Sequence, residues 1–347
     1  MDPRELFIST LKMEPTDRIP FVPRDLTLGM DAANIATDSV FGREFDAEAS
    51  ARSVIALQRM MRSEATVGTI FCYGLECFGG VTKYPTDGIP YVSEFAFADE
   101  ENMDRHDPSE IVNGLVDGFR RSMELVKERI PDVALITNVP GPMTMAGFAR
   151  GVETLMMDLE LNRGFVDRLL RFSTEAISYE MRHMSKDIAD GVFYASATDN
   201  PDMIGVENYI EHSVPYVKKL TEQVHDDGLL AIYHPHGVFS TDDRSDILKA
   251  SVDTGVDGFQ FSEGNDPEGM IPHTHGKCAI LGGVNAYSTL LLGPDERIVR
   301  DTKRYIEALK DESYIAMCSC SVHRKLPLHN LQVMADTVHS YRKVAGD

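Results

Sequence analysis

The sequence predicts an α/β protein that forms a single (β/α)8 TIM barrel. From about residue 65 onward, short β-branched runs alternate with amphipathic helical stretches. The apolar runs lack strict alternation with polar residues, which is typical of a parallel sheet covered by helices on both faces. Right-handed βαβ units repeated about eight times close such a sheet into a barrel. No Gly/Ser-rich or Pro-rich linker interrupts the chain, so we expect one domain over residues 1–347.

Two segments are expected to elaborate this barrel. Residues 1–65 form an N-terminal extension packed on the barrel, helical and loop-like apart from one extended piece around Pro20, Pro23 and Arg24. Residues 78–106 form a small β-rich insertion, because they contain two further β-branched runs.

Seven runs are candidate strands, and helical patterns with recognisable start signals lie between them. Asp107 precedes Pro108, an N-cap signal for a helix that we expect to continue to about Arg129. Further helices are expected over residues 162–183, from Thr241 through Ser251 and from Gly293 through Lys310. The candidate strands are Val67–Cys72, Val133–Thr137, Gly191–Ala195, Leu229–Tyr233, Gly258–Phe261, Ala279–Gly282 and Tyr314–Met317.

Composition excludes several classes of function. A chain of 347 residues can bury a large core. The formal net charge of −21 argues against nucleic acid or an acidic membrane as a partner, because both would be repelled. No run approaches the roughly 18–20 apolar residues of a membrane span, and the first residues lack the features of a signal peptide. We therefore expect a soluble, cytoplasmic protein.

The five cysteines show no disulfide framework, because their number is odd and their spacing irregular. Cys72 and Cys278 lie in apolar runs and are expected to be buried as small hydrophobic residues. Cys318 and Cys320 differ, because they follow a candidate strand at a spacing of two.

Polar residues follow the carboxyl ends of the candidate strands. In a barrel of this class, the functional residues lie at these ends. The polar residues are Glu76, Asn138, Asp199, His234 with His236, Gln260, Asn285, and Cys318 with Cys320. These side chains are metal-ligand and acid–base types, and the barrel would bring them to one mouth.

The pair His234 and His236 is the centre of this set. In extended backbone, residues two apart point to the same side, and Pro235 favours that extension. With Cys320, and a carboxylate such as Glu76 from another strand, they fit a zinc site with one position open for substrate. The alternative is a polar mouth whose histidines only form hydrogen bonds. A second His-x-His pair, His273 and His275, precedes a strand, so we expect solvated loop histidines on the opposite face.

The chain resembles the uroporphyrinogen decarboxylase superfamily and, within it, the corrinoid-dependent (methylcobamide) methyltransferase branch. The resemblance covers nearly the whole chain, and the order of the motifs makes it more specific than any one of them. The motifs lie at residues 17–20 (DRIP), 71–79 (FCYGLECFG), 139–144 (VPGPMT), 201–216, 281–294 and 320–330 (CSVHRKLPLHN). The Arg-Gln-Ala-Gly-Arg-Tyr stretch of the true decarboxylases is missing, since residues 23–28 are PRDLTL. This departure argues against porphyrinogen decarboxylation.

In the methyltransferase branch, the resemblance implies zinc bound by a His-x-Cys-Gly motif and a late cysteine. This chain matches with His234 and Cys320, but His236 stands at the cysteine position. Cys318 remains an additional candidate ligand. The resemblance also implies a corrinoid, which we expect on a separate partner protein because no cobalamin-binding Asp-x-His-x-x-Gly sequence occurs here.

An imidazole, as at position 236, is a chemically harder ligand than a thiolate. A zinc ion in the expected site is therefore better suited to act as a Lewis acid on a substrate oxygen. We therefore expect a zinc-dependent O-demethylase component that moves a methyl group from a methoxylated aromatic to the Co(I) of a corrinoid protein. In this hypothesis Glu76 is a ligand or base, and Asp199 or Asn285 orients the leaving group. Contacts with the substrate are expected from Tyr73, Asn138 and Gln260.

Two alternatives remain from the sequence. The same fold could transfer methyl from a methylcorrinoid to a thiol such as coenzyme M. It could also be a non-catalytic barrel that binds a ligand or a corrinoid protein, because one fold hosts many functions.

Overall fold

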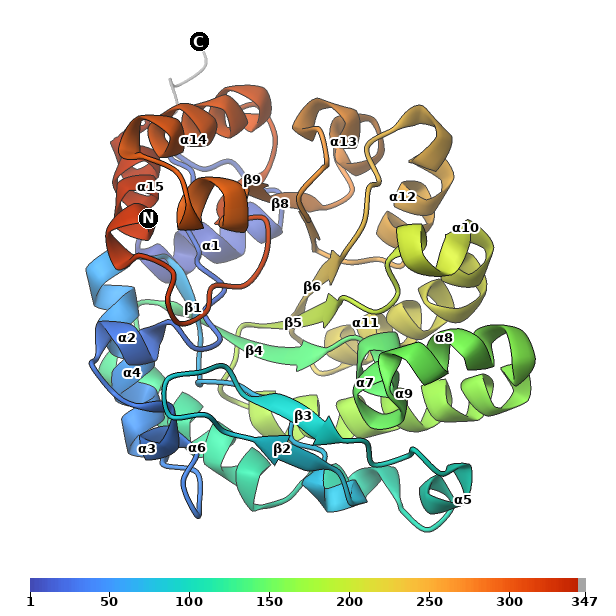
Figure 1. Ribbon diagram of the computed structural model, residues 1–347. Coiled ribbons are helices and arrows are strands. Elements are labelled where there is room, and N and C mark those ends of the chain that lie inside the picture. Colours follow the sequence, from blue (N-terminus) through green and yellow to red (C-terminus); the bar gives the residue numbers. More distant parts are fainter. Residues whose placement is uncertain (343–347) are drawn as a thin grey trace.

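A curved sheet of seven parallel strands lies at the centre of the molecule, with helices around it (Figure 1). The computed structural model describes residues 1–342. Each strand pairs with the next along the chain, which confirms the predicted barrel class. The strands are β1 (Ala65–Val67), β4 (Ala134–Pro140), β5 (Gly191–Ser196), β6 (Leu230–Pro235), β7 (Gly258–Phe261), β8 (Ala279–Val284) and β9 (Tyr314–Cys318).

Residues 20–26 fill the gap between the two edge strands β9 and β1. On one side, the Val22 backbone N–H donates to the Ala316 carbonyl oxygen of β9 at 3.0 Å. On the other side, the Glu64 N–H, one residue before β1, donates to the Phe21 carbonyl oxygen at 3.1 Å. The extended piece predicted within the N-terminal extension is therefore part of the barrel wall.

The inner face of the barrel changes from apolar to polar toward the carboxyl ends of the strands. Inward-facing Ile136, Phe193 and Ile232 form one buried cluster with Phe7 and Leu11 of helix α1 (Pro3–Leu11), which enter from the amino-terminal end. Because side chains alternate along a strand, residues two positions further also face inward. Those residues are Asn138, Ala195 and His234, so the polar layer lies at the mouth.

Amphipathic helices cover the outside of the sheet. The longest, α9 (Arg163–Ser185), buries Leu169, Leu170 and Ile177 against it. The other long helices are α4 (Ala47–Met61), α6 (Gly114–Arg129), α11 (Val214–Asp226), α14 (Asp295–Leu309) and α15 (Leu328–Ser340). The shorter ones are α2 (Gly29–Ala32), α3 (Thr37–Val40), α5 (Glu100–Met103), α7 (Pro142–Arg150), α8 (Val152–Leu161), α10 (Pro201–His212), α12 (Ser245–Val252) and α13 (Pro267–Thr274).

Residues 78–106 contain an antiparallel hairpin of β2 (Val81–Lys83) and β3 (Tyr91–Glu94), followed by α5. In Figure 1 this hairpin lies in front of the barrel sheet, near helices α7 and α8. No helix within residues 1–342 is both long and apolar enough to span a membrane.

The first predicted strand, Val67–Cys72, is wrong in its bounds, because β1 ends at Val67. Beyond it the chain leaves the sheet, and the Ile70 N–H donates to the Ser50 hydroxyl oxygen at 2.9 Å. The apolar run continues because Ile70, Phe71 and Cys72 are buried against helices α4 and α6 rather than in the sheet.

Two predicted helices begin later than their capping signals suggested. Pro108–Ile111 forms a separate 3-10 turn, and a new cap at Asn113 starts α6. Asp242–Arg244 is likewise a 3-10 turn, so α12 starts at Ser245. In both cases the residues at the predicted helix start form a separate 3-10 turn, and the amphipathic helix begins after it.

Candidate metal centre and barrel mouth

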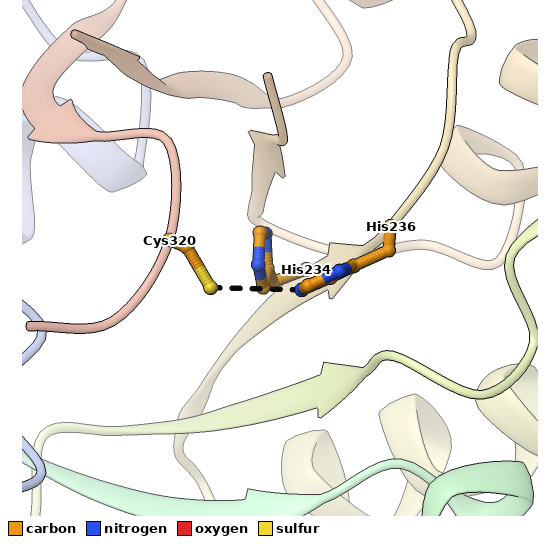
Figure 2. A group of neighbouring side chains, drawn as sticks. All are labelled: His234, His236 and Cys320. Atoms are coloured by element: carbon orange, nitrogen blue, oxygen red, sulfur yellow. Dashed lines mark hydrogen bonds between the residues drawn. The ribbon is translucent and has the colours of Figure 1, made fainter. Parts of the chain in front are cut away.

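His234, His236 and Cys320 converge at the mouth of the barrel and point toward one another (Figure 2). His234 is the penultimate residue of strand β6, and His236 directly follows that strand. Cys320 comes two residues after the end of β9. One ligand atom from each residue lies within 4.8 Å of the others. Among the residues the structure describes, this is the one such group of His, Cys, Asp and Glu side chains.

Local hydrogen bonds orient two of the three donors. His234 is fully buried, and its Nδ1 lies 3.1 Å from the Gln260 carbonyl oxygen. Its Nε2 has no hydrogen-bond partner in the structure. The Nε2 of His236 lies 3.6 Å from the Cys320 Sγ. Gly237 follows with a φ of +114°, a backbone conformation that lets the chain turn away directly after His236.

The electrostatics of the group favour a thiolate beside imidazole. Burial opposes ionisation of Cys320, but the adjacent His234 and His236 outweigh it and hold the pKa of this thiol well below its ordinary value. Burial lowers the pKa of His234 to about 4, so its imidazole is neutral at pH 7. Burial alone would lower the pKa of His236, but the adjacent Cys320 sulfur outweighs this effect and the pKa is raised.

The three donors fit a zinc ion. Zinc binds imidazole nitrogen and thiolate sulfur, and a catalytic zinc has three protein ligands with one position left open. The buried, unpartnered Nε2 of His234 is explained if it faces a metal, since buried polar atoms are otherwise hydrogen-bonded. The Gln260 carbonyl at Nδ1 is the kind of partner that fixes the ring of a metal-binding histidine.

Further unpartnered polar atoms surround this group. Asn138 is fully buried, and neither its Oδ1 nor its Nδ2 has a hydrogen-bond partner. The Gln260 amide donates from Nε2 to the Cys318 carbonyl oxygen at 2.8 Å, but its Oε1 has no partner. Ligand sites commonly supply the partners of such atoms. Asn138 and Gln260 thus keep polar atoms that no protein group satisfies.

Tyr73 lines a largely apolar cavity of about 570 Å³ between the β2–β3 hairpin and helices α7 and α8. Its ring stacks on Phe148 with the centroids 4.5 Å apart. Burial raises the pKa of Tyr73 to about 12, and the charges of Arg24 and Cys320 also act on it. Tyr73 therefore lines the cavity and is within electrostatic range of Arg24 and Cys320.

Glu76 does not join the three donors. It is exposed, and its Oε1 accepts a hydrogen bond from the Tyr84 hydroxyl at 3.0 Å. Tyr84 in turn stacks on Phe41 on the outer side of the barrel. The chain turns after β1 at a different point from the predicted one, which carries Glu76 away from the centre.

Asp199 and Asn285 lie just after strand ends and each has a protein partner, although the buried Oδ1 of Asp199 has none. Asp199 is buried, and its Oδ2 accepts from the Tyr233 hydroxyl at 3.4 Å. Burial raises its pKa to about 6, whereas hydrogen bonding and the charge of His236 act in the opposite direction. Asn285 caps the π-helical turn Ala286–Leu291, because its Oδ1 accepts the N–H groups of Tyr287 and Ser288.

Cys318 is not part of this group, and its Sγ donates to the Cys320 carbonyl oxygen at 2.9 Å. The second His-x-His pair is also outside the group. His273 belongs to helix α13 rather than to a loop, and His275 caps that helix and contacts Glu312.

Two further residues at the mouth, Arg24 and His323, were not among the site residues predicted from the sequence. Arg24 is buried, with its Nη2 3.9 Å from the Cys320 Sγ. His323 lies near both residues, and burial lowers its pKa to about 4. The sequence offered one signal for Arg24, namely an arginine inside an apolar extended run. Arginine is rarely buried unless its charge is paired.

Fold and site together define a parallel α/β barrel with a candidate metal centre at its mouth. The chain belongs to the family described as uroporphyrinogen decarboxylase (URO-D), whose model matches residues 2–341. This confirms the resemblance found in the sequence.

The chain is also similar to individual methyltransferases. It is 22% identical over 347 residues to the methylcobamide:CoM methyltransferase MtbA of Methanosarcina mazei, covering 98% of each chain. It is 23% identical over 223 residues to the methylcobamide:CoM methyltransferase MtaA of Methanosarcina barkeri, covering 63% of this chain and 62% of that one. A solved methyltransferase from Methanosarcina mazei has the same fold, with a TM-score of 0.86, 18% identity, and 98% and 99% coverage. These similarities support the corrinoid methyltransferase class, and they favour the thiol alternative over O-demethylation.

Proposed function

We propose that this protein transfers a methyl group from a methylated corrinoid, carried by a separate protein, to the sulfur of a small thiol. The observation that carries the proposal is the convergence of His234, His236 and Cys320 at the barrel mouth. Similarity over 98% of the chain to a methylcobamide:CoM methyltransferase supports this choice of substrates.

In this proposal, His234, His236 and Cys320 hold a zinc ion. When bound, the ion would supply Lewis-acid stabilisation of the substrate thiolate near pH 7. Burial keeps His234 neutral and therefore able to donate its Nε2 lone pair. The Gln260 carbonyl fixes the ring of His234, and Gly237 allows His236 to be placed beside Cys320.

The transfer is a displacement at the methyl carbon. The thiol loses its proton to solvent, the sulfur lone pair forms the new S–CH3 bond, and the Co–C bonding electrons remain on cobalt. Such a step needs alignment and exclusion of water more than acid–base chemistry. In this proposal the buried amides of Asn138 and Gln260 and the ring of Tyr73, which lines the cavity, hold the thiol.

We assign indirect roles to the other predicted catalytic residues. Asp199 is proposed to support the loop behind His236, because it is anchored through Tyr233 of β6. Asn285 is proposed to fix the turn after β8 through its capping bonds. Glu76 is proposed to hold the segment after β1 through Tyr84.

The test combines metal analysis with a transfer assay. Methylcobalamin and 2-mercaptoethanesulfonate are incubated with the purified protein, and the methyl thioether is measured by mass spectrometry. We expect about one zinc per chain, and loss of both zinc and product in the His236→Ala and Cys320→Ala variants. Cys318→Ala is the matched control, since this thiol faces the Cys320 carbonyl. Zinc-independent product formation, or no product with any thiol, would contradict the proposal.

O-demethylation of a methoxylated aromatic is the second candidate. Two observations favour it: an imidazole at position 236, and the cavity lined by Tyr73 and Phe148, which suits an aromatic ring. An assay with methoxybenzoates and a Co(I) corrinoid protein separates the two. Released phenol without thioether formation would establish demethylation, and zinc binding with neither product would leave a non-catalytic barrel.

A further inference from the structure

Glu180, on helix α9, carries a buried carboxyl group that the protein does not satisfy. The residue is 4% exposed, and its Oε2 has no hydrogen-bond partner. Burial alone raises its pKa to about 8, because no cation among the residues the structure describes acts in the opposite direction. An unpaired carboxylate is costly to keep in a protein interior. The carboxyl group at this position therefore requires a separate explanation.

Two other buried carboxylates show how this protein uses such groups for structural reasons. The Asp158 carboxylate accepts a hydrogen bond from the Arg150 Nε at 2.8 Å. The Glu64 Oε2 accepts the backbone N–H of Phe21 at 2.8 Å. Both carboxylates thus have donors within the protein, whereas the Oε2 of Glu180 has none.

Glu180 lines a small inner cavity of about 10 Å³, which has room for about one water molecule. The titratable groups that sense its charge are Cys72, Tyr73 and Cys77, and burial raises the pKa of all three. These groups are therefore neutral near pH 8, and Glu180 is the one ionisable group in this wall that titrates there. The other lining residues are Phe71, Tyr73, Gly74, Leu75, Ile111, Pro140, Met145 and Phe148.

A larger outer cavity of about 570 Å³ lies between the β2–β3 hairpin and helices α7 and α8 (Figure 1). Tyr73 and Phe148 line both cavities, and their stacked rings therefore stand between the two. Tyr91 and Phe95 add further rings to the outer wall. Glu153 is the charged residue of this wall, and no Lys, Arg or His side chain lines either cavity. The two cavities thus combine aromatic rings with carboxyl groups.

This composition suits an organic cation. The face of an aromatic ring attracts an alkylated ammonium group within about 6 Å of its centroid, and the attraction grows where water is excluded. A carboxylate behind the rings supplies the opposite charge. Arg24 and Cys320 act on Tyr73 with opposite signs, and neither acts on Glu180. An anionic ligand would instead be repelled by Glu153 and by the ionised form of Glu180.

We propose that the cavity between the β2–β3 hairpin and helices α7 and α8 binds a methylated or otherwise alkylated ammonium ion. Its cationic head lies against the Tyr73–Phe148 ring pair, and Glu180 is its counter-ion. When the ligand binds, Glu180 releases its proton to solvent and the carboxylate gains a partner. The site uses none of the three donors of the candidate metal centre. It goes beyond the methyl-transfer proposal and does not depend on it.

The first arm of the test compares two probes of the same shape, only one of which is charged. Choline and the neutral 3,3-dimethyl-1-butanol are titrated into the purified protein by calorimetry at pH 8. We expect choline to bind about 10-fold more tightly than the alcohol, or better. Glu180→Gln should weaken choline binding about 10- to 100-fold and leave binding of the alcohol unchanged. Glu175→Gln removes a charge from the exposed face of the same helix and is the matched control.

The second arm uses pH and the aromatic ring. Choline binding by the wild type should strengthen about 10- to 50-fold from pH 6 to pH 8, because Glu180 must lose its proton. Glu180→Gln should abolish this dependence. Phe148→Leu keeps an apolar side chain but removes the ring, and it should weaken choline binding about 3- to 10-fold. Circular dichroism and urea unfolding show whether each variant keeps the fold.

Several results would overturn this inference. They are equal affinity of the wild type for choline and the alcohol, an equal loss in Glu175→Gln, and tighter binding of the anionic 4-methoxybenzoate than of choline. Unchanged choline binding in Glu180→Gln would show that Glu180 is only a buried neutral acid. Failure of the methyl-transfer assay beside Glu180-dependent choline binding would contradict the proposed function and leave the cation site standing. Thioether formation without choline binding would do the reverse.

Discussion

At the scale of single residues, the candidate centre depends on how His236 is placed beside Cys320. Their Nε2 and Sγ atoms are 3.6 Å apart, although the residues are separated by more than eighty positions in the chain. Gly237 makes this approach possible, because its φ of +114° is rarely adopted by residues with a side chain. An added Cβ would lie 2.5 Å from the Asn200 Oδ1.

We therefore predict that Gly237→Ala weakens zinc binding as well as stability. The backbone strain should cost about 1–2 kcal/mol of unfolding free energy, and the contact with Asn200 should displace His236. Gly228→Ala is the matched control, because Gly228 also has positive φ but open space around its Cβ. Both variants should unfold at lower urea concentration, and Gly237→Ala alone should lose zinc. Equal zinc content in the two variants would contradict this account.

Glu180 provides a pH-dependent test at the same scale. This side chain of α9 is buried, and burial raises its pKa to about 8. Between pH 4.5 and 8 the folded protein then holds a proton that the unfolded chain releases, so this group lowers stability as pH rises. Glu180→Gln should therefore increase the unfolding free energy more at pH 8 than at pH 5.

The difference between the two pH values should be of the order of a few kcal/mol, measured by urea unfolding. Glu175→Gln, on the exposed face of the same helix, should show none. An unchanged pH slope in Glu180→Gln would mean that Glu180 is ionised in the folded protein.

At the scale of elements, residues 20–26 complete the barrel wall and carry Arg24 into its mouth. Glu64 contributes to this closure twice, through its backbone N–H and through its carboxylate. The Glu64 Oε2 accepts the Phe21 N–H at 2.8 Å and is itself buried. The wall therefore depends on one side chain where a regular ladder would use a backbone carbonyl.

We predict that Glu64→Ala lowers the unfolding free energy by about 1–3 kcal/mol, because it leaves the buried Phe21 N–H without an acceptor. Glu64→Gln keeps an oxygen acceptor and should cost less. Urea unfolding of both variants tests this, and equal losses would show that the hydrogen bond to Phe21 is not the stabilising feature.

The sequence predicts most of this architecture because parallel strands and amphipathic helices have strong local patterns. Gly258–Phe261 is found at its predicted bounds, and β6 and β9 differ from prediction by one or two residues. His234, His236 and Cys320 were predictable because His234 stands near the end of such a strand and the other two follow one. Residues 20–26 were not assigned to the wall, since their pairing with Ala316 depends on contacts nearly three hundred positions away.

The protein partners of Glu76 and Asn285 could not be predicted for a related reason. Position after a strand indicates the correct end of the barrel but not the direction of the side chain. The Tyr84 hydroxyl donates a hydrogen bond to Glu76, and the Asn285 oxygen caps the π-helical turn. These partners become visible only when the loops are placed.

At the scale of the whole molecule, the metal centre would join distant parts of the chain. His234 belongs to β6, whereas Cys320 lies beyond β9, with two strands of the sheet between them. A ligand that binds only the folded state stabilises it by mass action, by about 2.7 kcal/mol at a hundredfold excess over its Kd.

Zinc should therefore raise the thermal unfolding midpoint by a few degrees, and chelation should reverse the shift. Cys320→Ala should show no response to zinc, whereas Cys278→Ala, far from the mouth in the apolar core, should respond as the wild type does. A zinc-induced shift that persists in Cys320→Ala would place the ion elsewhere.

The most direct measurement is methyl transfer and zinc content determined on the same preparations of the wild type, His236→Ala and Cys320→Ala. Methylcobalamin and 2-mercaptoethanesulfonate serve as substrates, and the thioether is quantified by mass spectrometry. We expect about one zinc per wild-type chain, measurable thioether, and loss of both in each variant. Thioether formation by a zinc-free variant, or unchanged zinc in both variants, would contradict it.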